Sequence, residues 1–173
     1  MSGILKVASG SPITVNSSSA GWSATGNANR IERPDLVPGA SNNPVRGVSA
    51  GCTGGPAAGT RLRTPELWFD PCAFTVQPLG FFGNLGRNSV TGPDRVTLDF
   101  SLLKNAEIPQ ITEQARVQFR AEFFNIANHP NFGLPNLRLV DSRGRYDPRA
   151  GVITSTGGGT TARQIQFGLK FLW

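Results

Sequence analysis

The residue types that most often perform catalysis are sparse in this chain. His129 is the only histidine among 173 residues, and it lies in the polar stretch Asn-His-Pro-Asn. Nucleophilic catalysis of the Ser–His–Asp type needs a histidine that a third group orients. A single histidine in a polar stretch is more typical of a turn residue, so we predict no catalytic set around it.

Asp94, Asp99 and Glu122 are the carboxylates that could form an acid–base pair. Arginines accompany them in the same part of the sequence, at positions 95, 116 and 120. Structural networks of opposite charges also place carboxylates beside cations. A ladder of compensating charges is therefore the better interpretation of these residues.

Two glycine-rich stretches, 80–86 and 157–159, resemble phosphate-binding loops only in composition. Neither opens a helical pattern, and neither is followed by the Lys-Ser/Thr pair that such loops carry. We therefore predict no catalytic residue, no cofactor site and no metal site, and we expect the chain not to be an enzyme.

Cys52 and Cys72 are the only cysteines, and neither has a cysteine or histidine at metal-ligand spacing. They lie in a stretch with little apolar content, where a disulfide would help most in an oxidising compartment. The net charge is +6. The cations are scattered along the chain, so a nucleic-acid-binding face is a minor hypothesis and no nucleic-acid partner is expected.

The elements that must position these residues differ sharply between the two halves of the chain. The chain has 21 glycines and 13 prolines among 173 residues, a composition that disfavours long helices. After a short β-prone run at 3–9, residues 10–92 show no persistent period, which predicts one long loop. The apolar groups 67–69 and 81–82 are expected to pin this loop. Trp22 and Trp68 could grip a ligand or only staple the loop to itself.

Three stretches of the second half alternate strictly between apolar and polar residues, at 94–104, 114–126 and 162–173. This period of two predicts strands with one apolar and one polar face. The runs are about nine to twelve residues long, as tilted membrane-spanning strands are, whereas soluble strands usually have five or six residues. We therefore predict an all-β chain in which about four strands form an incomplete antiparallel transmembrane barrel, with long irregular extracellular loops.

The alternation assigns each strand residue to lipid or to the barrel lumen. The lipid-facing residues are predicted to be Val96, Leu98, Phe100, Leu102, Val117, Phe119, Phe123, Ile165, Phe167, Leu169, Phe171 and Trp173. The lumen-facing residues are predicted to be Arg95, Asp99, Arg116, Gln118, Arg120, Glu122, Gln164, Gln166 and Lys170.

The same alternation restricts how strands 94–104 and 114–126 pair. Even-numbered apolar residues on the first must oppose odd-numbered ones on the second, because a one-residue slip would reverse every side chain. A turn centred near Pro109 sets Phe100 opposite Phe119 and Asp99 opposite Arg120, and moving the centre of the turn by one residue either way would respect the same parity.

Several segments, taken in order, resemble the C-terminal part of TonB-dependent outer-membrane receptors, in particular the Oar-like branch that carries a carboxypeptidase-regulatory-like domain. The run FRAEFFNIANHPNFG at 119–133 is similar to that family's penultimate strand and the loop after it, and RQIQFGLKFLW at 163–173 is similar to its closing strand. The stretches 82–88 and 96–105 resemble the same part of the family, and 9–14 and 33–37 resemble it more loosely.

The resemblance implies a plugged barrel of 22 strands in the outer membrane that imports scarce ligands. It implies contact with membrane lipid, with the rest of the barrel and its plug, and with the barrel-assembly machinery through the last strand; TonB would be reached only through the plug. The sequence shows no plug, TonB box or signal peptide, so we expect a C-terminal fragment that does not transport alone. By strand parity, 10–92 and 127–161 would be extracellular and 105–113 a periplasmic turn.

Two other functions fit parts of the pattern. A soluble, secreted all-β binding or adhesion module would pack its apolar strand faces against each other. A basic sheet that binds nucleic acid would use Arg116 and Arg120.

Overall fold

The computed structural model describes residues 1–27, 30–110, 114–157 and 162–173. The chain divides into two compact units, which are described separately. The sheet unit comprises Met1–Ser9, Asp94–Asn131 and Gly158–Trp173, and the loop unit comprises Gly10–Pro93 and Phe132–Gly157.

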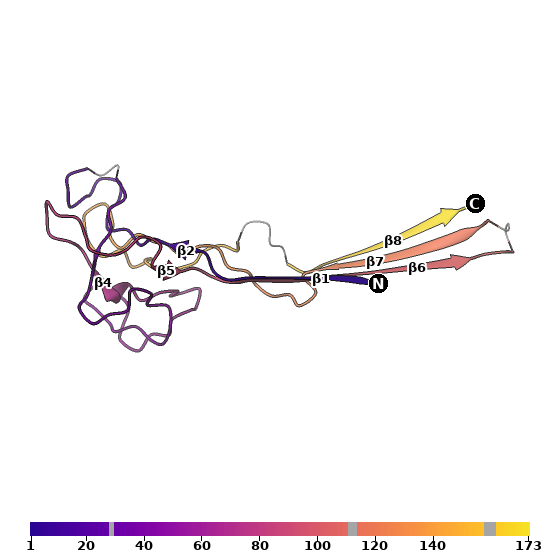
Figure 1. Ribbon diagram of the computed structural model, residues 1–173, viewed down its shortest axis with the longest axis horizontal. Helices are drawn as coiled ribbons and strands as arrows, with labels where there is room; N and C mark the ends of the chain where they lie inside the picture. The colour runs from indigo at the N-terminus through magenta and orange to yellow at the C-terminus, as the bar shows by residue number, and fades with distance from the viewer. Residues whose placement is uncertain (28–29, 111–113, 158–161) are drawn as a thin grey trace. The chain divides into compact units, whose positions relative to one another are not determined.

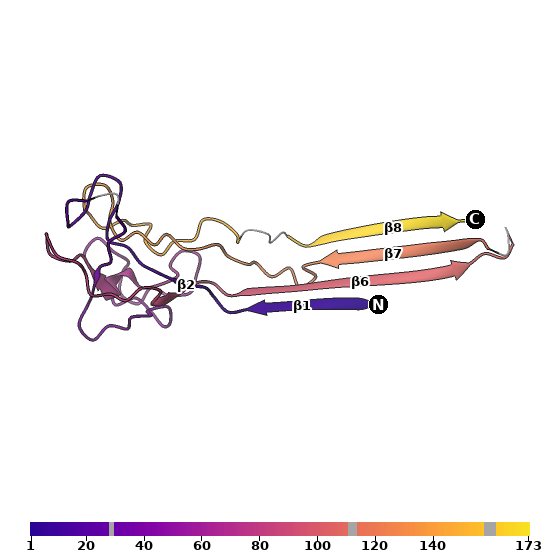
Figure 2. The ribbon, with the colours of Figure 1, turned by 45° about the horizontal axis from the view of Figure 1, so that its top comes forward.

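The sheet unit is one antiparallel sheet of four strands in the order β1-β6-β7-β8 (Figure 1; Figure 2). The strands are β1 (Ser2–Ala8), β6 (Arg95–Glu107), β7 (Arg116–Phe124) and β8 (Gln164–Leu172). Their β-branched and aromatic residues favour extended backbone. The prediction of an all-β chain with an incomplete antiparallel sheet of about four strands is confirmed. The sheet is open in the described residues, since β1 and β8 each pair on one side only.

The register places the alternating residues on two opposite faces. Leu5 opposes Leu98, Leu102 opposes Ala121, and Ala121 opposes Phe167. Directly opposed residues point to the same side of a sheet, so the alternating apolar residues of β6, β7 and β8, together with Leu5 and Val7 of β1, form one continuous face.

The predicted register of the β6–β7 hairpin is wrong, although its parity is right. Phe100 opposes Phe123 instead of Phe119, which moves the centre of the turn two residues toward the C-terminus. The ladder reaches Glu107 opposite Arg116, and beyond it the N–H of Ile108 donates to the carbonyl of Ala115 at 2.8 Å. The last pair of this longer ladder carries opposite charges. A turn centred at Pro109 would not set these two residues opposite each other.

The predicted pair of Asp99 and Arg120 is therefore absent. Asp99 Oδ1 instead accepts the backbone N–H of Asn125 at 2.9 Å. Arg120 donates to Glu122 Oε1 at 2.5 Å, two residues along the same strand. Asp99 and Arg120 therefore each bond to another partner.

The loop unit has little regular structure but a hydrophobic core of its own. Its short elements are β2 (Pro12–Ile13) paired with β5 (Val90–Thr91), β3 (Asp35–Leu36) paired with β4 (Phe74–Thr75), and the 3₁₀ turn η1 (Pro71–Ala73). The core consists of Ile13, Val15, Val45, Trp68, Phe69, Ala73, Phe74, Leu85, Val90, Leu139, Val140, Ala150 and Ile153. Residues from both segments of the unit contribute, so 132–157 completes a core that 10–93 begins.

The two apolar groups expected to pin this segment behave differently. Leu67, Trp68 and Phe69 are buried, as expected. Phe81 and Phe82 are 67% and 72% exposed, so the expectation that they pin the segment is wrong. The N–H of Phe81 closes a turn onto the carbonyl of Pro78 at 3.1 Å, which lifts both rings away from the core.

Candidate membrane wall and loop unit

No described part of the sheet unit covers the apolar face of the sheet. Phe167, Leu169 and Phe171 on β8 are 70%, 59% and 55% exposed. The rings on this face contact one another along the sheet: Phe119 lies 6.1 Å and Phe123 6.5 Å from Phe167, between ring centroids. Contiguous exposed apolar surface of this kind marks contact with a partner or a membrane.

The opposite face carries charged and amide side chains that bond to one another along and across strands. Gln118 Nε2 donates to Asn105 Oδ1 at 3.0 Å, and the hydroxyls of Ser2 and Ser101 lie 2.7 Å apart. Together with the ion pair of Arg120 and Glu122, these hydrogen bonds link polar side chains along and across the strands of this face.

The two ends of the sheet differ in what they connect. Because neighbouring strands are antiparallel, β1 ends, β6 begins, β7 ends and β8 begins at one end (Figure 2). Both long connections, 9–94 and 125–163, therefore leave from that end, whereas the other end carries the short β6–β7 connection. Long loops at one end and short turns at the other are typical of membrane barrels.

His129, the only histidine, lies in the turn that follows β7. Its backbone N–H donates to Asn125 Oδ1 at 3.1 Å, and Asn125 Nδ2 donates to the carbonyl of His129 at 3.2 Å. Asn125 adopts φ +48°, which asparagine tolerates better than most residues. Asn131, at the end of this turn, bonds to both backbone groups of Val96 at 2.7 and 3.0 Å. The side chain of Asn131 thus fixes the start of β6 to this stretch.

A disulfide joins Cys52 and Cys72, whose Cα atoms are 5.5 Å apart. Asp70 is 5% exposed and fastens the same region. Its Oδ1 accepts the hydroxyl of Ser49 at 2.8 Å and the N–H of Cys72 at 3.0 Å, and its Oδ2 accepts the N–H of Ala50 at 2.8 Å. Covalent and hydrogen bonds therefore hold segment 49–52 against η1.

Glu32 is a second buried carboxylate and is 2% exposed. Burial raises its pKa, but hydrogen bonds from the Ser23 and Thr25 hydroxyls and from the N–H groups of Ala24 and Thr25 outweigh burial, so the net pKa lies below its usual value. Gln77 Nε2 also donates to it at 3.2 Å. Glu32 is thus an ionised centre that organises 23–25 through neutral donors.

Asp147 is the third, at 2% exposed, and Arg149 supplies its charge partner. Its burial raises the pKa, whereas the N–H and guanidinium of Arg149 and the amide of Asn136 lower it below the usual value. The pair borders a hollow of about 340 Å³ in the loop unit. A second hollow, of about 270 Å³, is bordered by Arg30, Ile31, Glu32, Arg33, Phe82, Gly83 and Arg87.

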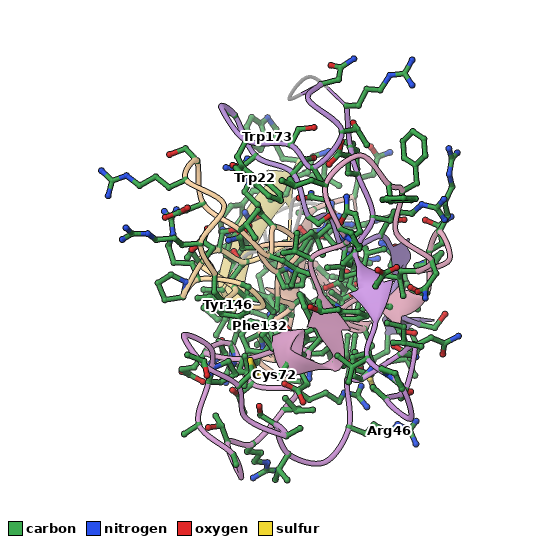
Figure 3. All side chains as sticks on the ribbon, turned by 90° about the vertical axis from the view of Figure 1, so that its left-hand side faces the viewer. Trp22, Arg46, Cys72, Phe132, Tyr146 and Trp173 are labelled. Carbon is green, nitrogen blue, oxygen red and sulfur yellow. A yellow bond between two sulfur atoms is a disulfide. The ribbon has the colours of Figure 1, made fainter. Side chains whose placement is uncertain are left out.

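The tryptophans belong to the packing of the loop unit. Trp68 is 4% exposed, and its Nε1 donates to the carbonyl of Thr91 at 2.8 Å. Trp22 packs against the hydrophobic core together with Phe132 and Tyr146, which Figure 3 labels. Of the two roles that the sequence left open for these rings, the structure favours that of a staple.

Comparison with protein families places this geometry in context. Residues 1–166 match the model of the outer membrane beta barrel domain. The match covers nearly the whole chain, both units included.

The chain belongs to the outer membrane beta-barrel domain family.

No curated protein and no solved structure matches the chain. Membership in the family assigns this outer-membrane barrel domain to the outer membrane, as the sequence predicted, and identifies the open sheet as an incomplete segment of a barrel wall. In the described residues no helix is long and apolar enough to cross a membrane. Among the same residues, no group of three or more metal-ligating side chains is gathered.

All strand residues predicted to face lipid lie on the apolar face of this barrel segment, and those predicted to face the lumen lie on the polar face, by register. Trp173 follows the last residue of β8 and is 89% exposed.

Sequence reasoning missed several members of both faces. Leu5 and Val7 of β1 join the apolar face, whereas Ile4 and Leu103 lie on the polar face. Only the pairing with β6 could have revealed the side on which β1 residues lie, because β1 is apolar at successive positions and carries no alternation of its own.

Proposed function

We propose that this chain forms part of the wall and the extracellular loops of a TonB-dependent outer-membrane transporter of the Oar-like branch. The single observation that carries the membrane-wall part of the proposal is the sheet itself: one face is apolar and exposed, the other is mainly polar, and both long connections leave from the same end. The resemblance of 119–133 and 163–173 to Oar-like receptors supports the finer assignment to that class.

The apolar face is proposed to contact lipid and the polar face the lumen. β7 and β8 each span nine residues and β6 spans thirteen, which is enough to cross the hydrocarbon layer when tilted. The loop unit would then be extracellular and the β6–β7 connection periplasmic, since barrels carry their long loops outside the cell. The disulfide fits a location outside the cytoplasm, because disulfides persist in oxidising compartments such as the periplasm and the cell exterior.

The unpaired edges of β1 and β8 indicate which partners the sheet needs. In hydrocarbon, each unpaired backbone group on β1 or β8 would cost several kcal/mol, so spanning sheets close into barrels. We therefore propose that further strands of the same transporter pair with both edges, and that β8 is presented to the barrel-assembly machinery. A plug domain elsewhere in the transporter would contact TonB. No catalytic step is proposed for the chain.

The soluble binding module is less well supported, because its apolar strand faces would have to pack against a second layer. The described sheet unit contains one layer, and the family is an outer-membrane family. The nucleic-acid hypothesis is also weak, since Arg120 is paired with Glu122.

The transcript that encodes this chain tests the transporter assignment. We expect its reading frame to encode a plug domain and further alternating strands upstream of Met1. In cells that make the whole product, a photo-reactive residue in the plug should cross-link to TonB. A reading frame without a plug would refute the assignment to this transporter class while leaving the outer-membrane family intact.

A further inference from the structure

The 270 Å³ hollow of the loop unit has an unusual composition. Three arginines and one exposed phenylalanine border it: Arg30, Arg33, Arg87 and Phe82. Its volume lies just below the range of small-molecule sites, which suits a compact ligand or one unit of a larger molecule.

The carboxylate that borders this hollow makes no ion pair with its arginines among the described residues. The oxygens of Glu32 accept from Ser23, Thr25, Ala24 and Gln77 instead. Each guanidinium carries five N–H donors. These arginines therefore keep donors for a ligand.

The three arginines differ in how they are engaged. Arg33 Nη1 donates to the carbonyl of Leu85 at 2.6 Å, which fixes its position. In the described part of the chain, no acceptor contacts the side chains of Arg30 and Arg87. The hollow thus combines one positioned guanidinium with two that are available for binding.

The apolar border is held in place by backbone contacts. The N–H of Gly80 donates to the carbonyl of Ala24 at 2.8 Å, and Gly80 adopts φ +84°, which glycine allows at little cost. A side chain at Gly83 would collide with the backbone of Arg33 and Pro34, so glycine lets this segment lie directly against theirs. Phe82 and Ile31 remain 72% and 77% exposed. The backbone therefore presents apolar surface beside the arginines.

We propose that this hollow binds an oxyanion attached to a flat ring, such as an aromatic carboxylate or its sulfonate equivalent. Planar guanidinium groups bind carboxylate in a two-pronged geometry, and Phe82 offers a ring face for stacking. The inference rests on the proposed function only where it treats this ligand as the transported substrate. Binding itself can be measured without transport.

Calorimetric titration of the complete transporter that contains this chain, in lipid nanodiscs, tests the inference, with benzoate as the probe and benzamide as its neutral match. We expect saturable benzoate binding and at least tenfold weaker benzamide binding. Arg87→Gln should weaken benzoate binding about tenfold or more, since a hydrogen bond to a charged group is lost. Arg87→Lys should recover part of the loss.

Arg46→Gln is the matched control. Arg46 is an exposed arginine of the same unit that does not border the hollow, and Figure 3 shows it extending away from the ribbon. This variant should bind benzoate within twofold of the parent chain. Phe82→Ala should weaken benzoate and leave acetate unchanged, which separates the ring contact from the charge contact.

Three results would overturn the inference: no benzoate binding, equal binding of benzamide, or equal losses in Arg87→Gln and Arg46→Gln. Circular dichroism and an intact disulfide check that each variant is folded. Cross-linking to TonB without benzoate binding would reject only this site. Benzoate binding without TonB cross-linking would keep the site and reject the transporter assignment.

Discussion

Phe167→Arg is expected to be the most damaging single change on the apolar face. Phe167 opposes Ala121, and it lies five residues from Leu172, which opposes Arg116 at the charged end of the ladder. Five residues of strand extend about 17 Å, or about 12 Å in depth at a 45° tilt. The apolar band of a barrel is about 25 Å tall, so Phe167 lies close to its middle.

An arginine at this depth costs about 2–4 kcal/mol. Loss of the ring contacts with Phe119 and Phe123 adds about 0.5–1.5 kcal/mol. The expected total is roughly 3–5 kcal/mol, and Phe167→Leu should show the ring part alone. Phe119 would be a weaker site for the same test, since Lys104 opposes it and a long lysine side chain can reach the interface.

Gln166→Arg is the matched control at nearly the same depth. Gln166 opposes Glu122 on the polar face, so the free energy of unfolding of this variant should differ from that of the parent by no more than about 1 kcal/mol. Guanidinium unfolding of the bilayer-embedded protein, followed by tryptophan fluorescence, measures both variants. Equal stabilities of Phe167→Arg and Gln166→Arg would refute the reasoning, because a face in water accepts arginine with little change.

Further predictions concern the register, the disulfide and the buried carboxylate. Cysteines introduced together at Ser101 and Glu122 should cross-link readily, whereas cysteines at 101 and 118 should not, since four residues of offset separate them by about 13 Å; gel mobility reports either outcome. Reduction of Cys52–Cys72, which are 20 residues apart, should lower loop-unit stability by roughly 3 kcal/mol and speed its proteolysis; an unchanged proteolysis rate would contradict the role given to the bridge. The lowered pKa of Glu32 means that its stabilisation is full above the unfolded value of 4.5 and is lost as pH falls through the lower folded pKa. Glu32→Gln should therefore destabilise the loop unit at neutral pH by about 1–3 kcal/mol and flatten its acid unfolding curve; an unchanged curve would show that Glu32 is not the group responsible.

The strands and their faces could be predicted because a period of two is written directly in the sequence. From Val96 to Leu102 and from Ile165 to Phe171, each apolar residue has a polar neighbour, and the parity of the hairpin follows from that alone. The exact register could not follow, since parity allows shifts of two residues. The pairing of Glu107 with Arg116 at the end of the ladder is visible only in the structure.

The loop unit was beyond sequence reasoning for a different reason. Its core gathers single residues from distant positions, such as Val15, Phe69 and Leu139, with no local period to mark them. Its three buried carboxylates look in sequence like ordinary surface residues. The pair Phe81 and Phe82 looks like core, yet a turn held by backbone hydrogen bonds exposes it.

Contact between the apolar face and lipid is the central claim, and a nitroxide scan of β8 tests it most directly. A spin label is placed at each position from 164 to 172 of the protein in bilayers, and its collisions with oxygen and with a water-soluble nickel chelate are measured. We predict oxygen maxima at 165, 167, 169 and 171 and nickel maxima at 164, 166, 168 and 170. An absence of alternation, or maxima in the opposite phase, would contradict the claim that this face contacts the membrane.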